Sequence, residues 1–174
     1  MDDMVRAALK KWPNVPHCYG WLALDARGDW YMRDERIQHA GPFPAVKGSR
    51  IEHDKLRAFI ERNYAADAAG CWFFQNGPQR VYVELEATPW IWRLQPDGRV
   101  LSHTGAQAIV QSSGLDEAGR LYLMTDLGPG LVHTADMGLA ADAVEQGRWV
   151  PQDLAASTLP QRFGFVRHPA PSPV

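Results

Sequence analysis

The sequence predicts one α+β domain in which a mostly antiparallel sheet, built from hairpins, packs on a capped helix. Three features predict it: short segments whose apolar residues alternate, one segment with helical spacing behind a capping sequence, and a recurring Asp-x-x-Gly turn. A chain of 174 residues is close to the usual size of one domain. We expect a single domain over residues 1–150 and an irregular, proline-rich tail over residues 151–174.

The clearest helix is predicted at about residues 50–65. Ser49-Arg50-Ile51-Glu52 fits a capping box, in which the Ser and Glu side chains satisfy open amides at a helix N-terminus. An apolar stripe at helical spacing follows it, formed by Leu56, Phe59, Ile60 and Tyr64. Shorter helices are expected over residues 4–12 and 137–146, the second with Asp136 as its cap. Residues 36–48 are expected to form a loop because they are rich in Gly and Pro.

Residues 80–86 give the clearest strand, because Val81, Val83 and Leu85 alternate with polar residues. Such alternation predicts one buried face and one face in water. The other expected strands are 19–24, 29–33, 71–75, 90–94, 99–102 and 121–125, which gives a sheet of about five to seven strands.

One turn sequence recurs along the chain, at Asp25-Ala-Arg-Gly28, Asp67-Ala-Ala-Gly70 and Asp116-Glu-Ala-Gly119, with Pro96-Asp97-Gly98 as a shorter relative. Local chemistry explains the pattern, since Asp bonds its own backbone and Gly supplies a positive φ. The spacings are unequal and a helix intervenes, which argues against a propeller or solenoid. Two pseudo-repeated halves stay open as an alternative.

Composition excludes several partners. The chain has 18 basic and 20 acidic residues without a basic stripe, so we expect no nucleic-acid partner. No apolar run is long enough for a bilayer, and the first residues lack an apolar signal region, so we expect no membrane association and a cytoplasmic location. Cys18 and Cys71 are expected to be free thiols.

Four stretches resemble a family of uncharacterised bacterial proteins: Trp12-Pro-Asn-Val-Pro-His-Cys-Tyr-Gly-Trp-Leu-Ala-Leu-Asp25, Gly70-Cys-Trp-Phe-Phe-Gln-Asn-Gly-Pro-Gln-Arg-Val-Tyr-Val-Glu-Leu-Glu86, Thr88-Pro89-Trp90 and His103-Thr104-Gly105. This resemblance covers roughly residues 12–135 and implies no mechanism. The order of hairpin, capped helix, aromatic strand and a strand ending near Glu86-Ala-Thr-Pro89 is also similar to a second uncharacterised bacterial family. That similarity implies a duplicated α+β architecture and a role in sensing a ligand or signal.

Catalytic and cofactor motifs are not found in the sequence. There is no Gly-x-Gly-x-x-Gly after a strand, no Gly-Lys-Ser/Thr loop and no Gly-x-Ser-x-Gly elbow. The histidines lack the short spacings of a zinc site, and His17 and Cys18 would point to opposite faces of a strand. We therefore expect no cofactor and no metal, and an enzyme is not favoured.

The alternative function rests on Glu84 and Glu86. They are two positions apart in the sequence of one strand, so their side chains would lie on one face, about 6.5–7 Å from each other. That separation overlaps the carboxylate pair of an inverting glycosidase, although alternation alone also explains it. The alternative is a hydrolase that uses either carboxylate with His103 as acid and base.

The favoured function is non-catalytic binding of a small ligand or a protein partner, in sensing or regulation. Arg80 would pair with an anionic group, Tyr82 would stack, and amide side chains would fix orientation. A scaffold role is a third class, which a large exposed apolar patch would favour. Large aromatics usually build cores, so only an exposed tryptophan would point to a site. The predicted site residues are Gln75, Asn76, Arg80, Tyr82, Glu84 and His103.

Overall fold

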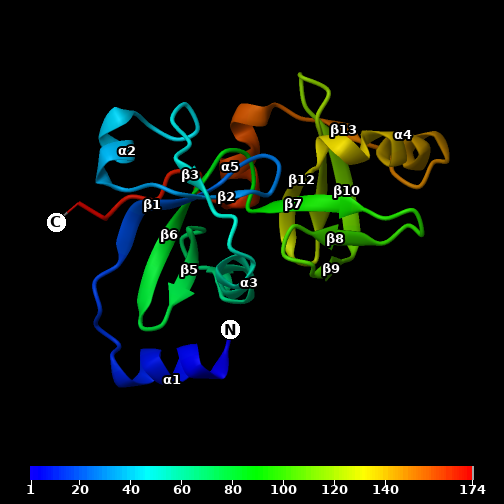
Figure 1. Ribbon diagram of the computed structural model, residues 1–174. Helices are drawn as coiled ribbons and strands as arrows, with labels where there is room; N and C mark the ends of the chain where they lie inside the picture. The colour runs from blue at the N-terminus through cyan, green and yellow to red at the C-terminus, as the bar shows by residue number, and fades with distance from the viewer. Residues whose placement is uncertain (174) are drawn as a thin grey trace. The chain divides into compact units, whose positions relative to one another are not determined.

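A computed structural model describes residues 1–173 (Figure 1). The chain divides into two compact units. Unit 1 consists of Met1–Asp25, Asp29–Glu86 and Phe165–Val174, and unit 2 of Ala26–Gly28 and Ala87–Gly164. Each unit contains one mixed sheet and at least one helix, so the α+β class is confirmed.

The sheet of unit 1 has six strands in the order β3-β2-β1-β6-β5-β4. Neighbouring strands are antiparallel except β1 and β6, which are parallel. The strands are β1 (Cys18–Leu24), β2 (Trp30–Met32), β3 (Ser49–Arg50), β4 (Tyr64–Ala66), β5 (Trp72–Asn76) and β6 (Gln79–Leu85). The helices are α1 (Asp3–Lys11), α2 (Glu35–Ala40) and α3 (Asp54–Arg62).

The sheet of unit 2 has seven strands in the order β13-β10-β11-β12-β7-β8-β9. They are β7 (Trp90–Leu94), β8 (Val100–Ser102), β9 (Gln107–Ala108), β10 (Val110–Leu115), β11 (Leu121–Thr125), β12 (Gly128–Val132) and β13 (Gln152–Asp153). The helical segments are η1 (Thr134–Asp136), α4 (Met137–Glu145), η2 (Ala156–Thr158) and α5 (Leu159–Phe163).

The two units are similar halves. Each contains two antiparallel three-stranded meanders, and in each the first strand of the first meander pairs in parallel with the last strand of the second. The parallel pair is β1 with β6 in unit 1 and β7 with β12 in unit 2. The halves differ in their helices, because α3 separates the meanders of unit 1 whereas α4 follows the second meander of unit 2.

The recurring turn has one geometry throughout. In each case the first residue's amide donates to the carbonyl oxygen of the fifth residue, and the fourth residue is a glycine with φ between 77° and 89°. Only glycine takes such a φ without strain, which is why this residue is fixed at the fourth position. The turns start at Asp25, Asp67, Gln95, Ser102 and Asp116.

Helix α3 packs on the sheet of unit 1 (Figure 1). Tyr64 of the predicted stripe lies outside the helix, in β4. Phe59 meets Phe74 of β5 edge to face at 5.5 Å, and Ile60 is buried. The predicted capping box is wrong, because Ser49 lies in β3 and pairs with β2 instead. The helix begins at Asp54, and the His53 side chain accepts the amide of Leu56.

Other elements depart from the sequence prediction. The expected loop contains α2, which is capped by the carboxylate of Asp34. Strands β9 and β10 occupy residues 107–115, where none was predicted. Asp136 does not cap α4, because its carboxylate binds Arg93 at 2.7 Å and the amide of Leu94 at 3.0 Å.

Two expectations about helix hydropathy and cysteine pairing can be compared with the structure of residues 1–173. No helix there combines the length and hydropathy that crossing a membrane requires. Both cysteines are free thiols, as predicted.

Candidate functional site

The hairpin of β5 and β6 positions five of the six predicted site residues. Gln75 and Asn76 end β5, and Arg80, Tyr82 and Glu84 lie along β6. The register sets Gln75 opposite Arg80, so these two side chains belong to one face of the sheet. The sixth residue, His103, belongs to unit 2.

Arg80 is a half-buried cation on an aromatic support. Its guanidinium carbon lies 4.3 Å from the centre of the Phe73 ring, within the range of a cation–π contact. Its Nη1 donates to the hydroxyl of Tyr82 over 3.4 Å. Within residues 1–173, no carboxylate forms an ion pair with this guanidinium, although most other arginines near acidic residues do. Arg80 therefore retains donors for an anion.

Tyr82 is buried, so the prediction that its face of β6 is in water is wrong at this position. Its ring stacks on Tyr19 of β1 at 4.8 Å, with Phe73 on another side at 5.8 Å. Its hydroxyl donates to Asp67 at 2.9 Å. Burial raises the pKa of Tyr82, and Asp67 raises it further while Arg80 opposes the shift. The tyrosine is a neutral link between Arg80 and Asp67.

Gln75 is fully buried, and its two amide atoms differ in their contacts. Its Nε2 donates to the carbonyl oxygen of Gly77 at 2.9 Å, which holds the tip of the hairpin. Its Oε1 is buried without a hydrogen-bond partner in the part of the chain that the structure describes. Buried acceptors of this kind are rare in proteins and call for an explanation. Asn76, next to it, is exposed.

The two carboxylates of the alternative hydrolase have other partners. Glu84 binds Nδ1 of His168 at 2.5 Å, and Glu86 binds Nζ of Lys47 at 3.2 Å. His168 reaches Glu84 because the C-terminal segment lies along the end of β6, where the amide of Leu85 donates to the carbonyl of Arg167. Sequence spacing gave no signal for this contact.

His103 lies in the turn after β8 and supports the fold of unit 2. Its Nδ1 accepts the amide of Ile91 at 3.2 Å, and its ring lies 5.8 Å from that of Trp90. No group of three or more possible metal ligands occurs within residues 1–173.

Three of the turns share a hydrogen-bond arrangement that the sequence analysis did not predict. In the turns that start with Asp25, Asp67 and Asp116, one carboxylate oxygen accepts backbone amides and the other accepts a tyrosine hydroxyl. The tyrosines are Tyr31, Tyr82 and Tyr122, at 3.2, 2.9 and 2.8 Å. A cation adjoins each: Lys47 and Arg120 bind the carboxylate directly, whereas Arg80 reaches it only through Tyr82.

Comparisons with known proteins give a family and a fold. The model of the family DUF2944, described as "Protein of unknown function (DUF2946)", matches residues 1–170. No curated protein matches the chain. A solved DUF1285 family protein from Silicibacter pomeroyi DSS-3 is 12% identical, with 82% of this chain and 84% of that chain covered and a TM-score of 0.51. At this identity the similarity concerns the fold alone.

A second solved DUF1285 family protein, from Shewanella baltica OS155, is 17% identical. The match covers 70% of this chain and 91% of that chain, with a TM-score of 0.46.

Proposed function

The chain belongs to the DUF2944 family, whose description assigns no activity, and from the geometry of unit 1 we propose that it binds a small anionic ligand without catalysis. Arg80 carries the proposal: a half-exposed guanidinium that contacts an aromatic ring and a tyrosine hydroxyl and has no carboxylate partner within residues 1–173. Guanidinium groups recognise carboxylates and phosphates with paired donors.

The surroundings of Arg80 support the same class of ligand. Phe73 and Tyr82 hold the guanidinium in one place, so less rotamer entropy is lost when an anion binds. On the facing strand, Oε1 of Gln75 is buried and not accessible to a ligand, so the contact with a ligand rests on the guanidinium. A hydroxy acid or an amino acid carries a carboxylate that this guanidinium would pair with.

The hydrolase has less support than binding. Glu84 contacts the His168 ring and Glu86 accepts from Lys47, and each contact joins separate segments of unit 1. The proposed acid–base partner, His103, has its Nδ1 engaged by a backbone amide of unit 2.

A thermal-shift screen with hydroxy acids, amino acids and inorganic phosphate tests the proposal on three proteins: wild type, Arg80→Gln and Arg57→Gln. Arg57 is a matched control because it is an arginine on α3 that pairs with Asp54. A ligand at about 100 times its Kd should stabilise unit 1 by about 2.7 kcal/mol. We expect this stabilisation in wild type and Arg57→Gln and its loss in Arg80→Gln. A ligand that stabilises all three proteins equally would remove Arg80 from the site.

A further inference from the structure

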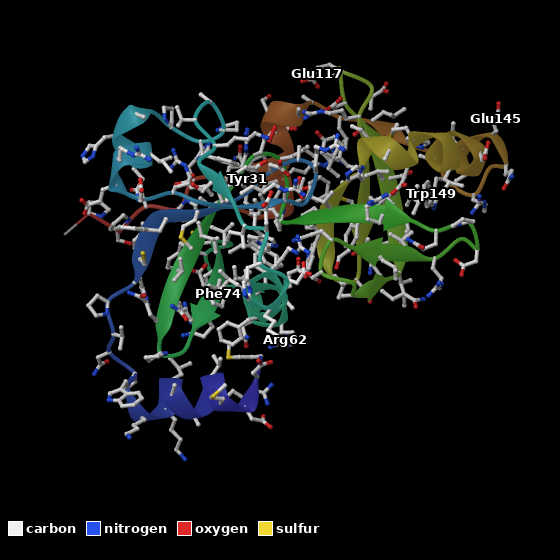
Figure 2. The ribbon with its side chains drawn as sticks, viewed as in Figure 1. Tyr31, Arg62, Phe74, Glu117, Glu145 and Trp149 are labelled. Atoms are coloured by element: carbon white, nitrogen blue, oxygen red, sulfur yellow. The ribbon has the colours of Figure 1, made fainter. Side chains whose placement is uncertain are left out.

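Unit 2 contains three surface depressions that share the same two lining residues, Arg148 and Trp149. Their volumes are about 300, 300 and 460 Å³, which are in the range of small-molecule sites. The first is lined by the turn between β7 and β8 and by α4, the second by β10, and the third by β8 and β9. Figure 2 shows Trp149 next to α4, close to that turn.

The end of α4 fixes where these two residues lie. Gly147, with a φ of 71°, reverses the chain after the helix. The amides of Arg148 and Trp149 both donate to the carbonyl oxygen of Ala143, at 2.9 and 3.4 Å. The pair is therefore attached to a helix end rather than to a free loop, which is the kind of support a binding site needs.

Trp149 differs from the tryptophans of the unit 2 core. Trp90 and Trp92 are buried, and their indole nitrogens donate to backbone carbonyls. Trp149 is only half-buried. An indole held at the surface by a helix end offers a flat face for stacking, which is how aromatic side chains bind nucleic-acid bases in single-stranded sites.

The charged residues around Trp149 indicate which other chemical groups a ligand that stacks on this indole would carry. Arg99 is already paired with Asp97 at 2.7 Å. Arg148 bonds the amide oxygen of Gln146 at 3.0 Å and has no ion pair within residues 1–173. Asp142, in the first depression, likewise forms no ion pair in that range and is an acceptor for a hydroxyl or amino group. The site thus combines a stacking face, an anion-binding cation and polar groups of both kinds.

We propose that Arg148 and Trp149 form a second ligand site, which binds a nucleoside monophosphate with its base stacked on Trp149 and its phosphate on Arg148. An aromatic carboxylate shares the combination of ring and anion. The nucleotide is the better fit because its ribose hydroxyls offer donors for Asp142, which lines the first depression together with Arg148 and Trp149. The site lies in a different unit from Arg80 and does not depend on the function proposed for unit 1.

NMR on the full-length ¹⁵N-labelled protein tests this site, with the indole N–H signal of Trp149 identified by its loss in Trp149→Phe. The probes are AMP, adenosine, inorganic phosphate and 4-hydroxybenzoate. We expect AMP to shift the Trp149 signal and to leave that of the buried Trp92 unchanged. Adenosine should bind more weakly than AMP, and phosphate alone more weakly still.

Three variants separate the two contacts. Arg148→Gln should weaken AMP binding about tenfold and leave adenosine binding unchanged, because only the charged contact is lost. Trp149→Ala should abolish the binding of both, whereas Trp149→Phe, which keeps an aromatic face and guards against misfolding, should retain AMP. Trp12→Ala, at an exposed tryptophan of unit 1, should change nothing.

Several results would overturn the proposal. They are an AMP titration that leaves the Trp149 signal in place, AMP binding that persists in a folded Trp149→Ala variant, and binding of 4-hydroxybenzoate in preference to AMP. An AMP response that disappears in Arg80→Gln would place the nucleotide in unit 1 instead.

Discussion

Replacing Tyr122 by Phe tests whether the contact between a turn aspartate and a tyrosine stabilises the fold. The Tyr122 hydroxyl donates to Oδ2 of Asp116 at 2.8 Å, and both side chains are buried. The substitution keeps the ring and its packing, so the lost hydrogen bond dominates the effect. A hydrogen bond to a charged group contributes about 1.5–3 kcal/mol. We therefore expect a loss of about 2 kcal/mol, with Arg120 left as the only side-chain donor to that oxygen among residues 1–173.

The equivalent substitutions in the other two turns supply matched controls. Tyr82→Phe removes a bond of 2.9 Å, and Tyr31→Phe removes one of 3.2 Å to an aspartate that Lys47 also binds. Tyr31 is half-exposed, so we expect its loss to cost about 0.5–1 kcal/mol, the lower end for a hydrogen bond. Urea unfolding at pH 7, followed by circular dichroism and by tryptophan fluorescence, measures all three. A midpoint for Tyr122→Phe equal to that of wild type, or a larger loss for Tyr31→Phe, would refute the reasoning.

The pH dependence of the same variant gives a second readout. Burial acts to raise the pKa of Asp116, but hydrogen bonds from the Arg120 amide and the Tyr122 hydroxyl outweigh it and hold the pKa below its usual value. A lowered carboxyl pKa contributes stability above the unfolded pKa, and this stability disappears as the pH falls through the folded pKa. The difference in unfolding free energy between wild type and Tyr122→Phe should therefore narrow in acid. A difference that stays constant with pH would show that the carboxylate is not involved.

Four further substitutions, at three glycines and at the cap of α3, are measured by urea unfolding. Gly119→Val should cost about 1–2 kcal/mol more than Ala118→Val, because φ at Gly119 is 77°, and equal losses would contradict this. Gly130→Ala should destabilise unit 2 by about 1–3 kcal/mol or more, since the new methyl group would lie 2.3 Å from a buried indole nitrogen. Gly138→Ala, in open space on α4, should instead stabilise by up to about 1 kcal/mol. His53→Ala should cost about 1 kcal/mol by removing the cap of α3, and an unchanged stability would reject that cap.

The turns could be predicted from sequence because their chemistry is local. Asp67 bonds amides two and four residues ahead, and Gly70 takes its positive φ within the same four residues. The start of α3 could not be predicted in this way. Ser49 has the sequence of a cap, but the backbone there pairs with β2, and a contact between separate strands has no local signature.

Part of the candidate site could also be predicted from sequence, because alternation along a strand is a local property. Alternation along β6 correctly placed Arg80, Tyr82 and Glu84 on one face, because strand geometry fixes it. Alternation could not show that Tyr19 covers Tyr82, since Tyr19 arrives on β1 through a parallel pairing with a break in register. The contact between Glu84 and His168 joins distant parts of the chain and escaped prediction as well.

Comparing equivalent positions in the two units shows which residues the shared strand pairing requires. In each second meander an Asp-x-x-Gly turn, at Asp67 or Asp116, joins the first two strands. The registers of the hairpins that follow then correspond position by position. Phe73 opposite Tyr82 in unit 1 corresponds to Tyr122 opposite Leu131 in unit 2.

At the next pair on the same face of these hairpins, Gln75 opposite Arg80 corresponds to Met124 opposite Pro129. The same strand pairing therefore forms with an apolar pair that has neither a cation nor an amide. The topology of the meander does not demand Arg80 or Gln75, and a buried amide acceptor without a partner is costly where an apolar side chain would serve. The ligand site proposed above therefore uses an arginine that the strand pairing itself does not require.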